Sequence, residues 1–203
     1  MTILDATTLS GRLVRLEPLS DAHVDGLREA VQDGRIHDLW YTSAPAPGEM
    51  AADVAAKLEQ GDRGLMLPFA IRRLDDGRLI GVTTFCNPLP SVPAVEIGYT
   101  WQAASAHGTG TNREAKLLML THAFEQWGCR RVCFRATWFN HPSRRAIERL
   151  GAVFEGRIRN DRIMRTGEVT DTAQYSITDG DWPAVRRHLD LSLIHISEPT
   201  RPY

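Results

Sequence analysis

The chain has 203 residues and a mass of 22.7 kDa, and its 24 basic and 25 acidic residues leave a formal net charge of −1. This length favours one domain with an ordinary hydrophobic core. A content of 42% hydrophobic and 24% charged residues excludes a disordered chain. The near-neutral charge and the pI of about 6.7 argue against a general binder of nucleic acid or of anionic membranes.

Three cysteines, Cys86, Cys129 and Cys133, occur in a chain without a secretory apolar segment. Their odd number predicts free thiols in a reducing cytoplasm. No His or Cys pair stands near them at zinc-site spacing, so we expect no metal. No run approaches the roughly eighteen apolar residues that a membrane helix needs. We therefore expect a soluble, cytoplasmic protein without a membrane segment.

The first part of the chain alternates between strand and helix signals. Apolar alternation predicts a strand over residues 11–19, and a helix follows from the N-cap candidates at Ser20 and Asp21 to residue 33. Residues 40–48 form a proline-punctuated loop, and the alanine-rich residues 49–60 predict a helix that Gly61 ends.

The middle and the end of the chain supply more strands around one long helix. Asp75-Asp76-Gly77 predicts a hairpin turn, and Gly151 ends a helix that starts at His141-Pro142-Ser143. The predicted strands are 66–74, 79–86, 95–101, 131–139, 153–158 and 172–177, and the strongest helix is 111–128. With no repeat and no linker, this order predicts a single α/β domain over residues 1–190.

Residues 191–203 (LSLIHISEPTRPY) do not continue this pattern. They resemble, over about eleven residues, the in-frame translation of a sequencing-library adapter, and such appended segments are excluded from fold reasoning. A short C-terminal strand over residues 191–196 is the alternative, because its β-propensity would allow one. We expect residues 191–203 to be a non-native tail.

A glycine-containing loop, His107-Gly-Thr-Gly110-Thr-Asn112, separates a predicted strand from the longest predicted helix. Glycines before a helix let backbone N–H groups approach a phosphate, and the helix N-terminus carries partial positive charge. The loop lacks the Gly-Lys pair of a Walker A motif, and Arg113 stands where a dinucleotide fingerprint would have its third glycine. The loop alone could also be an ordinary turn.

The wider context of this loop resembles the GNAT family of N-acetyltransferases, and most closely its RimJ/RimL-type protein N-acetyltransferases. The segments that carry the resemblance are residues 96–103, 107–112 and 140–152. It implies a single domain with a mixed, mostly antiparallel sheet flanked by helices, in which a splayed strand pair holds acetyl-CoA as co-substrate. It also implies an amine acceptor, and homodimers are common in the family.

The resemblance assigns the acetyl-CoA contacts residue by residue. The family's loop, [Gln/Arg]-x-x-Gly-x-[Gly/Ala], wraps the pyrophosphate, and here His107, Gly110 and Asn112 occupy its three defined places. Only the glycine is standard, and Asn112 adds a side chain where the backbone normally comes close. The expected contacts are Thr100, Gln102, His107, Gly108, Thr109, Gly110, Thr111, Asn112 and Asn140, the last of these through its side chain to the pantetheine amides.

The catalytic groups that the resemblance implies are Glu96 and Ser143. Glu96 has the place of a general-base glutamate, although it could instead orient an arginine or cap the strand edge. Ser143 has the place of a serine that protonates the leaving thiolate, although Ser143 or Asn140 could simply cap the helix. The tyrosine that many members use as the acid is replaced here by Ile147.

Trp40 and Tyr41 fall in the loop that lines the acceptor cleft in this family, although they could equally cover the edge of the core. Together these residues predict an acetyl-CoA-dependent N-acetyltransferase in which the amine attacks the thioester directly. The acceptor is a protein N-terminus or a small amine. The alternative is a non-catalytic module that binds acyl-CoA and regulates.

Overall fold

The computed structural model describes residues 7–197, and within this range the strands form one eight-stranded sheet in the order β1-β2-β3-β4-β5-β6-β8-β7. The strands are β1 Leu9–Ser10, β2 Val14–Pro18, β3 Met66–Arg73, β4 Leu79–Leu89, β5 Ala94–Gln102, β6 Arg131–Thr137, β7 Val153–Ile163 and β8 Val169–Thr178. Every neighbouring pair is antiparallel except β5–β6. The expected mixed, mostly antiparallel sheet is therefore confirmed.

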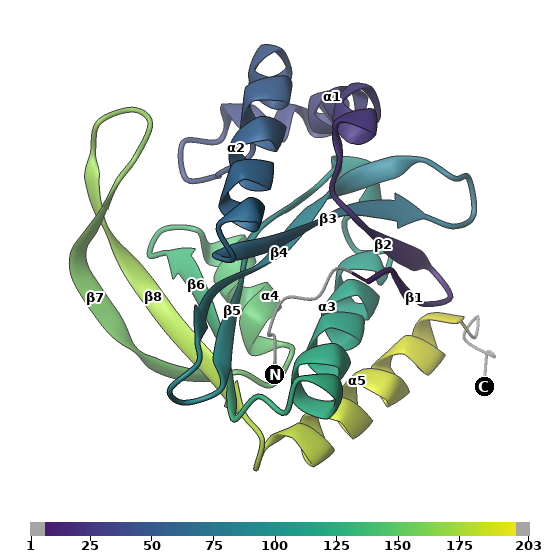
Figure 1. Ribbon diagram of the computed structural model, residues 1–203, viewed down its shortest axis with the longest axis vertical. Helices are drawn as coiled ribbons and strands as arrows, with labels where there is room; N and C mark the ends of the chain where they lie inside the picture. The colour runs from purple at the N-terminus through teal and green to yellow at the C-terminus, as the bar shows by residue number, and fades with distance from the viewer. Residues whose placement is uncertain (1–6, 198–203) are drawn as a thin grey trace, which may run out of the picture.

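Helices cover both faces of this sheet. The α-helices are α1 Val24–Gln32, α2 Met50–Asp62, α3 Thr111–Thr121, α4 His141–Glu148 and α5 Trp182–Ser197. Figure 1 shows α1 and α2 on one face and α3 with α5 on the other. No helix in the described range is long and apolar enough to cross a membrane.

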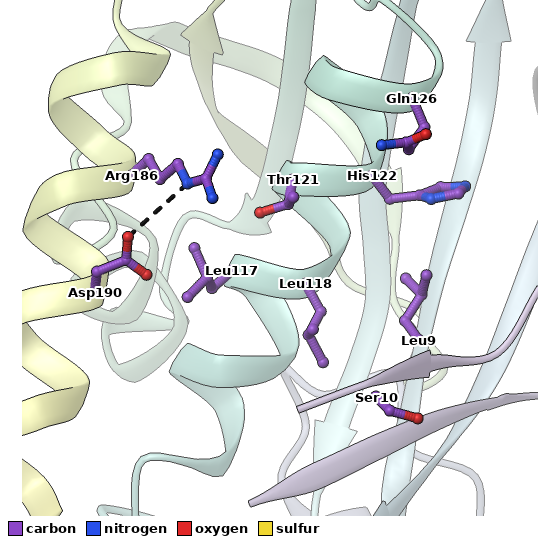
Figure 2. A pocket seen from close by; sticks show the side chains of 9 residues that line it. All are labelled: Leu9, Ser10, Leu117, Leu118, Thr121, His122, Gln126, Arg186 and Asp190. Carbon is purple, nitrogen blue, oxygen red and sulfur yellow. Dashed lines mark ion pairs between the residues drawn. The ribbon is translucent and has the colours of Figure 1, made fainter. Parts of the chain in front are cut away.

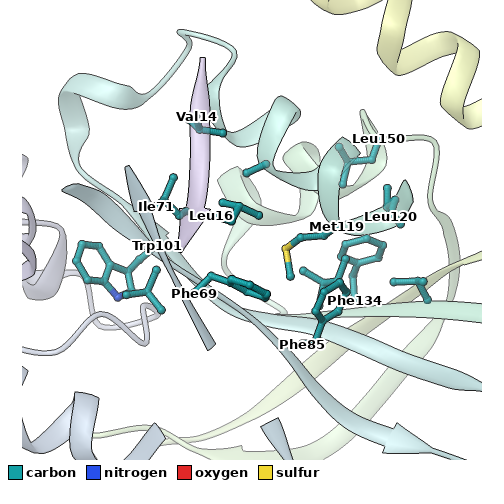
Figure 3. Packing of buried hydrophobic residues seen from close by; sticks show 14 of the residues in the cluster. Val14, Leu16, Phe69, Ile71, Phe85, Trp101, Met119, Leu120, Phe134 and Leu150 are labelled. Atoms are coloured by element: carbon teal, nitrogen blue, oxygen red, sulfur yellow. The ribbon is translucent and has the colours of Figure 1, made fainter. Parts of the chain in front are cut away.

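The core lies where the sheet meets its helices. Leu16, Phe69 and Phe85 of the sheet and Met119 of α3 are completely buried, and Figure 3 shows their side chains packed together. The apolar residues of α3 recur at helical spacing because they lie on the side of the helix that faces the strands. This packing fixes α3, and with it the loop before α3, against the centre of the sheet.

Several element boundaries differ from the prediction. The helix predicted over residues 111–128 is α3 followed by a π-helical turn, η5 His122–Gln126. In the hairpin β7–β8, both strands extend further toward the connecting turn than predicted, because β7 ends at Ile163 and β8 begins at Val169. Four 3₁₀ turns connect other elements: η1 Asp21–His23, η2 Asp33–Asp38, η3 Pro47–Glu49 and η4 Ala104–Ala106. Strand β1 and helix α5 were not predicted.

The α5 helix crosses the expected domain end at residue 190. Residues 191–197 are helical, which rules out the short strand considered as an alternative, and Leu193 is buried. The Arg113 guanidinium also donates a hydrogen bond to the Ser192 carbonyl at 3.3 Å. The rest of the expected tail, residues 198–203, lies outside the described residues, as do residues 1–6. A non-native origin of residues 191–203 stays a prediction.

Candidate active site

The parallel strands β5 and β6 pair over only three positions and then separate. Their register ends at Glu96 opposite Cys133, although β5 continues to Gln102 and β6 to Thr137. At about 3.3 Å per residue, β5 runs about 20 Å beyond Glu96. The side of β5 that faces β6 therefore has unpaired backbone, which is the splayed arrangement that the resemblance implied.

A bulge marks β5 just beyond the point of separation. Its register against β4 shifts between the pairs Thr84–Gly98 and Val82–Trp101, and Tyr99 between them has a φ of 50°. A non-glycine residue in this region carries strain, and bulges re-aim the residues beside them. The next residue, Thr100, is one of the predicted acetyl-CoA contacts.

The glycine loop follows at the carboxyl end of β5 and leads directly into α3. Gly108 and Gly110 have φ values of 77° and 90°, which glycine adopts without penalty. The first N–H groups of a helix have no intrahelical partner, so the start of α3 presents donors and partial positive charge to the loop. His107 turns back, and its Nε2 lies 3.0 Å from the Gln102 carbonyl oxygen.

Two orphaned polar atoms lie beside this loop. The Thr111 hydroxyl donates to Gln102 Oε1 at 3.1 Å, while Gln102 Nε2 and Asn112 Oδ1 are buried without a partner among the described residues. Buried polar groups normally have partners. The orphaned atoms, the glycine backbone and the helix start fit a phosphate-bearing ligand with amide groups, which is the chemistry of coenzyme A.

Helix α4 begins at the carboxyl end of β6. Asn140 caps it, because its Oδ1 accepts the Ser143 backbone N–H at 3.0 Å. Of the two cap residues considered, the structure therefore selects Asn140, and Ser143 lies partly exposed in the first turn. The two N–H bonds of Asn140 Nδ2 can still donate to a ligand.

Glu96 is buried beside the separation point, with 7% of its surface exposed. Its Oε2 accepts a hydrogen bond from Asn87 Nδ2 at 2.9 Å and lies 3.7 Å from Arg135 Nε. Both neighbours orient the carboxylate. The contact with Arg135 is the arginine contact that we considered as an alternative, and the base role stays a prediction.

Trp40, which is predicted with Tyr41 to line the acceptor cleft, lies beside the start of α4. Trp40 is 42% exposed, and its ring centroid lies 5.9 Å from that of Phe139 and 5.8 Å from that of Tyr41. Phe139 directly precedes Asn140, so the loop between α1 and α2 meets the start of α4. Tyr41 joins this exposed aromatic group through Trp40.

The cysteines do not offer a nucleophile. Burial raises the pKa of the Cys133 thiol, and it raises the pKa of Cys129 to about 11. Both shifts disfavour the thiolate. The described residues also contain no cluster of three or more His, Cys, Asp or Glu that could hold a metal ion.

Figure 2 shows a separate pocket of about 360 Å³ between α3, α5 and β1. Leu117, Leu118 and His122 line it, and the ion pair Arg186–Asp190, at 3.9 Å, lies at its edge. It contains none of the predicted site residues. Part of a neighbouring pocket is built by Leu193 and Ile194 of the expected tail, so we assign no function to this region.

Three residues near the site were missed in the sequence. Asn87 and Arg135 hold Glu96, and Lys116 of α3 contacts Thr100. Asn87 and Arg135 carry no local signal, because tertiary packing alone brings them to Glu96. Lys116 could have been noticed, because it lies one residue from Ala115 and three from Met119 on the apolar side of a predicted helix.

A splayed parallel strand pair, a glycine loop at a helix start and a capped helix beside it together define an acetyltransferase fold. The family model described as "Acetyltransferase (GNAT) domain" matches residues 13–153. The chain belongs to the GNAT family of acetyltransferases, whose members use acetyl-CoA. This confirms the family, the fold and the co-substrate expected above.

Individual relatives agree with this assignment. The Bacillus subtilis (strain 168) protein named "Putative ribosomal N-acetyltransferase YdaF" is 34% identical over 109 residues, which are 54% of this chain and 58% of that protein. A GCN5-related N-acetyltransferase from Brucella melitensis is 28% identical, with a TM-score of 0.82 over 92% of this chain and 85% of its own. RimJ of Mycobacterium smegmatis, solved in complex with CoA-disulfide, shares the fold at 21% identity, with a TM-score of 0.78 over 92% and 95% of the two chains.

Proposed function

We propose that this protein is an acetyl-CoA-dependent N-acetyltransferase that moves an acetyl group to a primary amine. The amine attacks the thioester directly, without a covalent enzyme intermediate. One observation carries the proposal: β5 leaves β6 after Glu96, while the glycine loop and the α4 cap lie at the carboxyl ends of these strands. Ligand sites of open α/β sheets typically lie at such ends.

Acetyl-CoA supplies the activated acetyl group in this proposal. The start of α3 and the loop 107–112 hold the pyrophosphate through backbone N–H groups. The unpaired edge of β5 at Thr100 and Gln102 pairs with the pantetheine amides, and Asn140 donates to them from Nδ2. Backbone and side-chain donors of this kind position the thioester without taking part in the chemistry.

Glu96 and Ser143 carry the proton transfers in this proposal. Glu96 takes a proton from the attacking amine, directly or through one water, while Arg135 and Asn87 keep its carboxylate oriented. The Ser143 hydroxyl donates a proton to the departing thiolate and takes one back from solvent, while Glu96 releases the amine proton to solvent. Ile147 stands where many members have a tyrosine acid, which leaves Ser143 as the acid on α4.

A protein N-terminus is the acceptor that we place first. The similar Bacillus protein is named as a ribosomal N-acetyltransferase, and the exposed aromatic pair Trp40 and Phe139 offers a surface beside α4 to an incoming chain. A small amine is the other acceptor to be tested. A cytoplasmic location and a homodimer, as is common in the family, complete the proposal.

The test is thiol release on mixing the protein with acetyl-CoA and a panel of amines. The panel contains peptides with a free α-amine, the same peptides with a blocked α-amine, an amino acid, a polyamine and an aminoglycoside. We expect release with free peptides and none with blocked ones. Thiol release with the small amines alone would show that the acceptor is a small amine and not a protein N-terminus. Coenzyme A binding without thiol release would favour the non-catalytic module.

Ser143→Ala tests the acid within the same assay. Loss of a general acid lowers turnover by about a hundredfold or more, while the affinity for coenzyme A should stay within about threefold. Ser10→Ala, on the exposed strand β1, is the matched control and should behave as wild type. Unchanged turnover of Ser143→Ala would remove Ser143 from the mechanism.

A further inference from the structure

Lysine is almost absent from this chain, and both lysines are buried. Of the 24 basic residues only Lys57 and Lys116 are lysines, and the other 22 are arginines. Their exposed fractions are 7% and 5%. Arginine stays charged in proteins, whereas a buried lysine can lose its proton and has a compact head with three donors. Among the described residues, the buried basic side chains are thus lysines, and a guanidinium at either place would be larger and permanently charged.

The two lysines have different surroundings. Lys57 of α2 forms an ion pair with Asp53 one helical turn away. Lys116 of α3 has no such carboxylate partner among the described residues, and its Nζ donates to the hydroxyls of Thr83 and Thr100, each at 2.7 Å. An ammonium group buried on two hydroxyls pays a desolvation cost that these contacts do not recover. Stability therefore does not explain why Lys116 is buried at this position.

The location of Thr100 offers an explanation for the buried Lys116. It directly follows the bulge residue Tyr99, on the part of β5 that has left β6. Its hydroxyl also lies 2.8 Å from that of Thr83 on β4. Lys116 therefore ties α3, which begins at the glycine loop, to both strands at the bulge.

The direction of these hydrogen bonds has a chemical consequence. Lys116 Nζ donates to the Thr100 hydroxyl oxygen. The Thr100 proton is then directed to the Gly98 carbonyl oxygen at 3.4 Å or to the Thr83 hydroxyl at 2.8 Å, both within the bulge. Removing Lys116 removes the link between α3 and β5.

We propose that Lys116 is a positioning residue of the acetyl-CoA site, which acts through Thr100 to hold the bulged part of β5 in the conformation that receives the co-substrate. This inference rests on the proposed function for the place of acetyl-CoA. It adds a residue that does not touch the co-substrate itself. Burial supports it, because the pKa of Lys116 is lowered to about 7, a perturbation of the kind that clusters at functional sites.

The first test is a double-mutant cycle on coenzyme A affinity, measured by calorimetry. Losing a hydrogen bond that involves a charged group weakens binding about tenfold, so Lys116→Met and Thr100→Val should each raise the Kd by about that factor. The double variant should be no worse than either single variant, because both remove the same interaction. Thr100→Ser, which keeps the hydroxyl, should raise the Kd less than Thr100→Val does.

Leu120→Ala is the matched control for a purely structural effect. It opens a cavity on the same helix without touching either threonine, so it should lower the melting temperature and leave the Kd unchanged. In turnover assays, Lys116→Met should raise the KM for acetyl-CoA more than it lowers kcat. Wild-type Kd and KM in a folded Lys116→Met would overturn the inference and leave the proposed function intact, whereas failure of the wild type to bind coenzyme A would overturn both.

A second measurement needs no variant of Lys116. With lysine labelled by ¹³C at Cε, NMR should show one signal for each of the two lysines, and Lys57→Arg assigns the remaining signal to Lys116. Saturation with coenzyme A should shift the Lys116 signal, and removal of coenzyme A should return the signal to its original position. A Lys116 signal that stays unchanged at saturation would contradict a role at the acetyl-CoA site.

Discussion

Lys116 makes the stability of this protein depend on pH in an alkaline range, well above the acidic range in which the carboxylates titrate. Burial lowers its pKa to about 7. In the unfolded chain its pKa is about 10.4. Between about pH 7 and pH 10 the unfolded chain therefore holds a proton that the folded protein has released, and the free energy of unfolding rises with pH.

The expected slope is up to about 1 kcal/mol per pH unit. Lys116→Met should lack it and should be the more stable protein below pH 7, where the folded wild type must bury the charge. Urea denaturation of both proteins at several pH values between 6 and 10 measures the difference. A constant difference across this range would show that Lys116 does not titrate in the fold.

Asn140 contributes to stability through the cap of α4. Its Oδ1 accepts the Ser143 N–H at 3.0 Å, and loss of such a cap costs about 1 kcal/mol. We expect Asn140→Ala to lower the free energy of unfolding by that amount, and Asn140→Asp, which can still cap, to restore most of it. Equal stability of all three proteins in urea would show that the cap is unimportant.

At the scale of elements, Glu114 ties α3 to the first strands. Its carboxylate accepts three backbone N–H groups, from Arg12 at 2.9 Å, Leu13 at 2.7 Å and Val14 at 2.8 Å. These contacts hold the beginning of α3, and so the glycine loop, against the edge of the sheet. The sequence gives no sign of them, because about a hundred residues separate the partners.

We expect Glu114→Ala to lower the free energy of unfolding by about 3 kcal/mol, since three backbone donors, that of Val14 buried and those of Arg12 and Leu13 partly buried, lose their acceptor. Glu114→Gln keeps one acceptor oxygen and should lose less. Thermal unfolding followed by circular dichroism compares the two. A smaller loss for Ala than for Gln would argue against the hydrogen bonds as the cause.

The elements differ in how far the sequence could predict them. The apolar spacing of α3 and the Asp75-Asp76-Gly77 turn are local signals, and both were confirmed. Helix α5 was missed, although Trp182, Val185 and Leu189 recur at helical spacing. The glycine loop was located correctly, but the contacts of Glu96 and Lys116 were not, because they depend on packing between distant segments.

For the whole molecule, the status of residues 191–203 is open to a direct test. Their described contacts include the burial of Leu193 and the hydrogen bond from Arg113 to Ser192. Deleting residues 191–203 should therefore lower the free energy of unfolding by no more than about 3 kcal/mol, the contribution of one buried leucine, and leave coenzyme A affinity unchanged. Loss of the folded state or of coenzyme A binding on deletion would place these residues within the native domain.

The whole chain combines a family fold with a site whose details are its own: an asparagine in the glycine loop, an isoleucine in place of the tyrosine acid, and a buried lysine behind the bulge. In the function proposed above, acetyl-CoA binds at the end of the splayed strands, and Glu96 and Ser143 carry the proton transfers.

The most direct measurement is mass spectrometry of a peptide with a free α-amine after incubation with acetyl-CoA and the protein, beside the same reaction with Glu96→Gln. We predict one acetyl group on the N-terminal amine with wild type and a rate at least about a hundredfold lower with Glu96→Gln, at similar coenzyme A affinity. No acetylated product from any amine, in a protein that binds coenzyme A, would contradict the account.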